Sequence, residues 1–109
     1  MSSASPALSH LVFFTLVDNS AENVEHLIQE CQTYLDDHPG LKYFAVGRLN
    51  VDLSRPVNDK SFNVSLITVF EDRAAHDAYQ VAPRHLEFIE RNKASWKQVR
   101  VFDSDLAGN

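Results

Sequence analysis

The chain has 109 residues, a length typical of one domain, and 44% of them are hydrophobic while 23% are charged, as in ordinary globular proteins. Ten Lys and Arg residues stand against 15 Asp and Glu residues, and the formal net charge of −5 argues against nucleic acid or an anionic membrane as the main partner. The single cysteine, Cys31, excludes an intrachain disulfide and favours a reducing, cytoplasmic location.

Both ends of the chain are polar. Residues 1–7 lack the basic and apolar regions of a secretory signal, and we expect them to form a disordered lead. No segment approaches the ~18 consecutive apolar residues of a membrane span. Residues 104–109 are expected to form a flexible tail, so the predicted domain covers residues 8–103.

The first predicted element is a strand at residues 8–17. Its sequence, LSHLVFFTLV, is rich in β-branched and aromatic side chains, and apolar residues occupy both even and odd positions. This pattern is typical of a strand that is covered on both faces.

A helix is predicted next. One apolar stripe at helical spacing is formed by Val24, Leu27, Ile28, Cys31 and Leu35. Asn19 with Glu22 three residues later resembles a capping pair for its start, and the HPG segment at residues 38–40 ends it.

The second half contains three more strands and an interrupted helical segment. Strands are predicted at residues 42–52, 61–70 and 96–103. Asp72 caps a short helix that ends at Tyr79, and Pro83 starts another helix with an apolar flank of Leu86, Phe88 and Ile89. The order βαββαβ predicts an α+β, ferredoxin-like fold with a four-stranded antiparallel sheet and helices on one face.

The first and third strands carry more apolar side chains than one layer of helices covers. A monomer would expose either Leu11 and Phe13 or their neighbours Val12 and Phe14 to water. A second copy of the chain, related by a two-fold axis, is the simplest cover. We therefore expect a homodimer with two sheets packed face to face, a dimeric α/β barrel.

A candidate site lies in AYQVAPRHLEF, residues 78–88. Pro83 disfavours a helical conformation at Ala82, so the chain turns there and His85 falls in the first turn of a new helix. A helix N-terminus disfavours imidazolium, and a neutral His85 is suited to remove a proton beside a carbonyl that Tyr79 orients. The alternative is structural: Tyr79 packs in the core and His85 bonds to a backbone carbonyl.

Three segments resemble a known family when taken in order: SHLVFFTL, HPGLKYFAVGRLN and FNVSLITVFEDRAAHDAYQVAPRHLEFI. From His10 to Phe102 the chain resembles the stress-responsive dimeric α/β-barrel (Dabb) family, and in particular its olivetolic-acid-cyclase-type members. The resemblance implies a pocket in which His85 is the catalytic base, Tyr79 works with it, and His10 binds substrate. Ala82 and Val64 stand where those cyclases carry further pocket histidines.

Metal and nucleotide motifs are missing from the local sequence. There is no His-x-His, no HExxH and no Cys/His cluster, so no metal or other cofactor is expected unless distant segments converge. His26 and His76 are interpreted as surface residues, and His38 as part of a turn.

Three functions agree with the predicted fold and its candidate residues. The first is a cofactor-free lyase, cyclase or isomerase acting on a small hydrophobic carbonyl compound, with His85 as base. The second is a non-catalytic dimeric module that binds a small ligand or serves stress physiology, and the third is a cofactor-independent monooxygenase. A cavity that reaches Tyr79 and His85 favours the first function, whereas a plugged interior favours the second.

Overall fold

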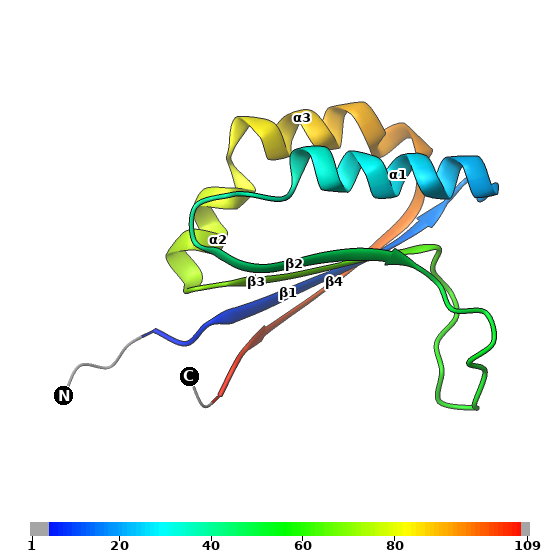
Figure 1. The fold of residues 1–109 in the computed structure, drawn as a ribbon, viewed down its shortest axis with the longest axis horizontal. Helices are drawn as coiled ribbons and strands as arrows, with labels where there is room; N and C mark the ends of the chain where they lie inside the picture. The colour runs from blue at the N-terminus through cyan, green and yellow to red at the C-terminus, as the bar shows by residue number, and fades with distance from the viewer. Residues whose placement is uncertain (1–4, 108–109) are drawn as a thin grey trace.

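The computed structural model describes residues 5–107 as one antiparallel sheet with helices on one face (Figure 1). The strands are β1 (Leu8–Leu16), β2 (Leu41–Arg48), β3 (Val64–Phe70) and β4 (Trp96–Asp105), in the order β2-β3-β1-β4. The helices are α1 (Ala21–Tyr34), α2 (Arg73–Gln80) and α3 (Pro83–Asn92), and a short 3-10 turn, Lys93–Ser95, leads into β4. The predicted ferredoxin-like βαββαβ fold is confirmed, including the interrupted second helix.

The two faces of β1 differ. Its even-numbered side chains, from Leu8 to Leu16, are buried beneath the helices, while the odd-numbered ones are partly exposed on the opposite face. Because paired residues on adjacent strands share a face, His10 lies beside Thr68 of β3 and Asp103 of β4 on the helical side. Among residues 5–107, no helix is long and apolar enough to cross a membrane.

Helix α1 packs its predicted apolar stripe against the sheet. Leu27, Ile28, Cys31 and Leu35 are buried, and burial raises the pKa of the Cys31 thiol to about 12, as expected for a core cysteine. The predicted capping pair is wrong. Ser20 is the N-cap residue, and its hydroxyl accepts a hydrogen bond from the backbone N–H of Asn23 at 3.2 Å.

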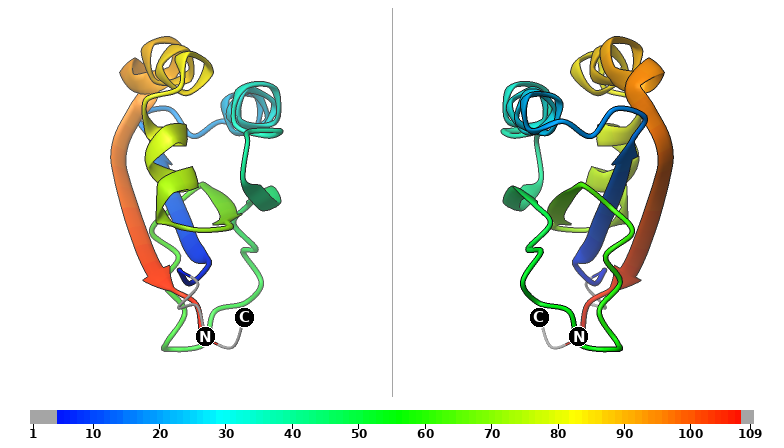
Figure 2. Two further views of the ribbon diagram at one scale, coloured as in Figure 1. Left: turned by 90° about the vertical axis from the view of Figure 1, so that its left-hand side faces the viewer. Right: turned by 90° about the vertical axis from the view of Figure 1, so that its right-hand side faces the viewer.

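Helices α1 and α3 lie side by side over the sheet (Figure 2). Both carboxylate oxygens of Glu30 accept hydrogen bonds from the guanidinium of Arg91, at 2.8 and 3.0 Å, and Asn92 adds another at 3.0 Å. Arg91 holds the pKa of Glu30 below its usual value. This contact holds α3 against α1 and so fixes the positions of both helices over the sheet.

Several strand boundaries differ from the prediction. β2 ends at Arg48 and β3 begins at Val64, because residues 49–63 form a long connection in which Asn50 and Asn58 side chains accept local backbone hydrogen bonds. At the other end, β4 continues through Ser104 and Asp105, which pair with β1. Two residues predicted in a flexible tail therefore belong to the sheet. Residues 1–4 and 108–109 of the expected termini lie outside the described residues.

The break between α2 and α3 lies where the sequence predicts it. The Asp72 side chain caps α2 by accepting a bond from Ala75 N–H at 2.8 Å, and Pro83 occupies the first turn of α3, both as predicted. The predicted apolar flank of α3 is wrong at Leu86, whose side chain is 49% exposed, while that of Phe88 is buried. A step of one residue rotates a helical side chain by ~100°, which carries Leu86 away from the face of His85.

Candidate functional site

The interruption between α2 and α3 brings Tyr79 and His85 into contact. Ala82 is extended, with φ −65° and ψ 139°, and α3 restarts at Pro83. The ring centroids of Tyr79 and His85 lie 4.5 Å apart. In a continuous helix, six residues would rotate the second side chain by ~240° from the first, so the break is what makes this pair possible.

Tyr79 is buried in the core and is only 2% exposed. Its ring packs against Phe70 and His38, with centroid distances of 4.8 and 4.9 Å. The Tyr79 hydroxyl is buried and has no hydrogen-bond partner among residues 5–107. Such a group costs about 1–3 kcal/mol, and burial also raises its pKa, so the hydroxyl keeps its proton and remains a free donor.

The hydrogen bonding of His85 determines which of its two ring nitrogens carries the proton. Its Nδ1 lies 3.1 Å from the backbone oxygen of Gln80, and because a carbonyl only accepts, Nδ1 must carry the proton. In the neutral ring, Nε2 then holds the lone pair. Burial lowers the pKa of His85, while the Gln80 carbonyl opposes this shift. The predicted direction of the shift agrees, and desolvation is its largest cause.

A cavity of about 170 Å³ lies between the sheet and α3. The three predicted site residues, His10, Tyr79 and His85, all line it, together with Gln80 and apolar side chains from β1, β3, β4 and α3. Trp96 forms another part of the wall, and its indole N–H is buried without a partner in the described part of the chain. The cavity is therefore apolar with a few unpaired polar groups, as small-molecule sites commonly are.

A larger groove of about 1060 Å³ lies elsewhere, between α1 and the connection from β2 to β3. It is lined by charged side chains such as Glu22, Glu25 and Lys60, and by none of the three predicted site residues. Volume alone therefore does not identify the candidate site, whereas the unpaired buried groups do.

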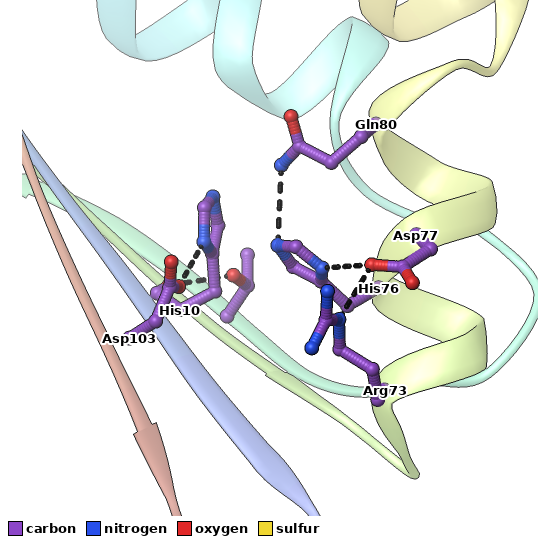
Figure 3. Close-up of polar contacts among 7 residues, drawn as sticks. His10, Arg73, His76, Asp77, Gln80 and Asp103 are labelled. Carbon is purple, nitrogen blue, oxygen red and sulfur yellow. Dashed lines mark hydrogen bonds and ion pairs between the residues drawn. The ribbon is translucent and has the colours of Figure 1, made fainter.

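Beside the cavity, His10 belongs to a polar cluster (Figure 3). The Asp103 carboxylate accepts a hydrogen bond from His10 Nδ1 at 2.5 Å, and the Thr68 hydroxyl donates to the His10 backbone oxygen at 2.7 Å. The ring of His76 lies 5.0 Å from that of His10. Asp77 and Arg73 continue the cluster along α2: Asp77 accepts from His76 Nδ1 at 3.0 Å and from Arg73 Nε at 2.9 Å.

Two histidines differ from the sequence-based expectation. The sequence predicts His76 at the surface, but its side chain is only 14% exposed. It lies three residues before Tyr79 and therefore on the same face of α2, a spacing that could have revealed it. His38 does belong to a turn, yet it is buried, and its Nε2 donates to the Tyr34 backbone oxygen at 2.8 Å.

Gly40 explains how that turn reaches Tyr79. Gly40 has φ +80°, and a Cβ at this position would lie 2.4 Å from the Cβ of Ala75 on α2. Only glycine allows this backbone conformation and this close approach. The turn is consequently pressed against α2, with His38 directed at the Tyr79 ring.

The sequence matches the model of one protein family over most of its length. The model of the stress responsive A/B barrel domain, Dabb, matches residues 8–106. The chain belongs to the Dabb family. No curated protein sequence matches it significantly.

Solved structures of similar proteins agree with the Dabb fold. A Dabb protein from Mesorhizobium loti has a TM-score of 0.77 at 23% identity, covering 95% of this chain and 100% of its own. A dimeric ferredoxin-like protein from Jannaschia has a TM-score of 0.72 at 28% identity, with coverages of 92% and 99%. The hydroxynitrile lyase from Passiflora edulis has a TM-score of 0.74 at 19% identity, with coverages of 95% and 96%.

At two positions the sequence lacks a histidine that the resemblance to cyclase-type proteins implies. Ala82 is the N-cap residue of α3 and supplies no side-chain hydrogen bond there. Val64 is fully buried at the start of β3. The side chains with polar groups that line the cavity are His10, Tyr79, Gln80, His85 and Trp96.

The environment of His85 predicts its titration. We expect an NMR titration to give His85 a pKa below the ordinary value of ~6.5, since burial penalises its charged form. A depressed histidine pKa means that the unfolded chain binds more protons in this range. The free energy of unfolding should then fall as the pH decreases from ~6.5 through the folded-state pKa. A His85 pKa at or above ~6.5 would contradict this assignment.

Proposed function

We propose that this Dabb chain binds a small hydrophobic carbonyl compound in the 170 Å³ cavity and transfers a proton at the carbon beside the carbonyl. The reaction class is that of a lyase, cyclase or isomerase that needs no cofactor. The observation that carries the proposal is the pairing of a buried, unpartnered Tyr79 hydroxyl with a proton-free His85 Nε2 beside one cavity.

The two groups have complementary roles. His85 Nε2 takes the proton from the carbon, and negative charge develops on the carbonyl oxygen of the resulting enolate. The Tyr79 O–H, which no protein group in residues 5–107 occupies, donates to that oxygen. His85 Nδ1 remains bonded to Gln80, so the ring keeps its orientation while it gains the proton. His85 can then return the proton to the same carbon or to a leaving group.

Cavity size limits the substrate. A cavity of about 150 Å³ lined by apolar side chains accommodates one benzene molecule, so about 170 Å³ suits one six-membered ring or a short chain. The unpaired indole N–H of Trp96 favours a second acceptor group on the ligand. The Passiflora edulis hydroxynitrile lyase supports the proposal at the level of the fold, because it is a lyase on this scaffold.

We further propose that the chain is a homodimer. The sheet face opposite the helices carries Leu11, Phe13, Ile67 and Phe102, and Phe13 packs edge-on against Phe62 and Phe102 at 5.0 and 5.6 Å. Ile67 and Phe102 are 38% and 50% exposed in the single chain. An apolar sheet face of this kind fits a two-fold sheet-on-sheet contact, and similar structures are described as dimeric.

The direct test is exchange of the hydrogens next to a carbonyl. Cyclohexanone and 2-pentanone fit the size limit, and in D₂O their exchange is followed by proton NMR. We expect the protein to accelerate exchange above the buffer rate, with saturation at high ketone concentration. If ketones perturb the cavity resonances without faster exchange, the non-catalytic binding module is correct. If they neither exchange nor perturb those resonances, the carbonyl ligand is wrong as well.

A further inference from the structure

Three potential metal ligands converge beside the cavity, from three separate parts of the sequence (Figure 3). They are His10 on β1, His76 on α2 and Asp103 on β4. One nitrogen from each imidazole and one carboxylate oxygen lie within 4.8 Å of one another. The register explains the first pair, since His10 and Asp103 are directly opposite each other on adjacent strands. Helix α2 then places His76 next to His10.

We propose that His10, His76 and Asp103 form a binding site for a divalent transition-metal ion, for which Zn²⁺ is the probe. Two imidazoles and one carboxylate are a ligand set that zinc accepts, with further positions open to water. Calcium and magnesium prefer oxygen ligands and would not select two histidines. Soft-metal sites would need thiolates, and Cys31 is buried in the core outside this group.

The three ligand atoms need to move only a short way to reach the spacing found around a zinc ion. Ligand atoms around tetrahedral zinc lie ~3.3 Å apart, given bonds of ~2.0–2.1 Å. The widest separation in the group must therefore shrink by about 1.5 Å or less, while the 2.5 Å contact between His10 Nδ1 and Asp103 opens. The ion displaces the proton on His10 Nδ1, which is released to solvent or moves to Nε2 of the same ring. The Asp103 side chain is 44% exposed and is the less enclosed of the two groups in this contact, so it is the one that can move.

The surroundings of His76 fit a ligand histidine. The Asp77 carboxylate accepts from His76 Nδ1–H, which leaves the lone pair on Nε2. Among residues 5–107, the hydrogen-bond partner of that nitrogen is the Gln80 side-chain amide alone, at a long 3.4 Å. A carboxylate that orients a histidine from behind is the usual outer partner of a metal-bound imidazole. Arg73 holds Asp77 in turn, at 2.9 Å.

The position is open to an ion from solvent. A depression of about 360 Å³ is lined by His76, Asp103 and Asp105, with Arg73 and Leu8 at its sides. Among the described residues that line this depression or bond to His76, the carboxylates of Asp77, Asp103 and Asp105 are accompanied by one guanidinium, that of Arg73. A divalent cation is thus favoured over an anion.

The inference is independent of the proposed function. His10 lines the cavity on one side and belongs to the cluster on the other, whereas His76 and Asp103 do not line the cavity. Tyr79 and His85 are not ligands. Metal binding is therefore measured without reference to turnover, and either proposal can fail alone.

The test is calorimetric titration of the untagged full chain, dialysed against a chelator and then against buffer, with ZnCl₂. We expect one Zn²⁺ per chain and selective perturbation of the His10 and His76 ring signals in NMR spectra. His76→Ala should weaken binding by at least about tenfold, and Asp77→Asn should weaken it by about tenfold or more through the lost outer hydrogen bond. Asp103→Asn, at a partly exposed edge position, serves if His76→Ala does not fold.

His26→Ala is the matched control. His26 is an exposed histidine on α1 with Glu22 four residues before it, a pair on a helix surface that binds zinc weakly at most. Binding should be unchanged in this variant. The proposal is overturned if the wild-type chain takes up no zinc, if His26→Ala loses as much affinity as His76→Ala, or if neither His76→Ala nor Asp103→Asn weakens binding.

Discussion

His85→Gln should lower the rate of ketone hydrogen exchange by about 10²–10⁴-fold, the usual contribution of a positioned general base. Glutamine retains a donor that can reach the Gln80 carbonyl but has no basic nitrogen, so the wall of the cavity is kept while the base is removed. Exchange is measured by proton NMR in D₂O, under saturating ketone. His26→Gln makes the same change at an exposed position on α1 and should leave the rate unchanged.

Tyr79→Phe separates catalysis from structure in the same assay. It deletes only a hydroxyl that bonds to no other residue in the described range, so thermal stability should stay level or rise. Exchange should nevertheless decrease, because the enolate oxygen loses its donor. Tyr34→Phe is the control, since its exposed hydroxyl donates to Glu87 at 3.1 Å, away from the cavity. Unchanged exchange in both His85→Gln and Tyr79→Phe would refute the proposed chemistry.

Ile67→Asp should convert the proposed dimer into a monomer. Ile67 lies in β3 on the face opposite the helices, next to Leu11 and Ala45 in the sheet. In a two-fold packing of that face, two carboxylates would be buried without partners, a cost of several kcal/mol per ion. Size-exclusion chromatography with light scattering should give twice 12.3 kDa for the wild type and 12.3 kDa for the variant.

Leu86→Asp is the control for this experiment. Leu86 is likewise an exposed apolar residue, but it lies on α3, on the other side of the molecule from the proposed interface. This variant should remain dimeric. A wild-type chain that elutes as a monodisperse monomer at micromolar concentration would show that the exposed sheet face has no partner copy.

The sequence predicts those features that repeat at a regular period or rest on local backbone chemistry. The alternation in β1 and the stripe of α1 arise from such periods, and the interruption between α2 and α3 follows from the restricted backbone at Pro83. The contact of Tyr79 with His85 was therefore accessible from the sequence. Their roles in binding and catalysis remain a proposal.

The features that the sequence does not predict depend on long-range pairing. Asp103 stands beside His10 only because β1 and β4 adopt one particular register, across 93 residues of chain. His38 reaches Tyr79 because Gly40 lets a turn approach α2. Neither relation has a local motif. The predicted strand ends are also misplaced, since Asn and Asp side chains at the ends of strands can bond to the backbone and compete with sheet pairing.

The alternation of β1 separates two kinds of evolutionary change. Substitutions at the even positions His10, Val12 and Phe14 alter the cavity, whereas those at the odd positions alter the face proposed to meet a second copy. Duplicated genes could therefore diverge in partner choice through residues such as Leu11 and Phe13 while they conserve the cavity wall at His10. A few substitutions in β1 could then let two diverged copies pair with each other, and each copy of that mixed dimer would keep its own cavity.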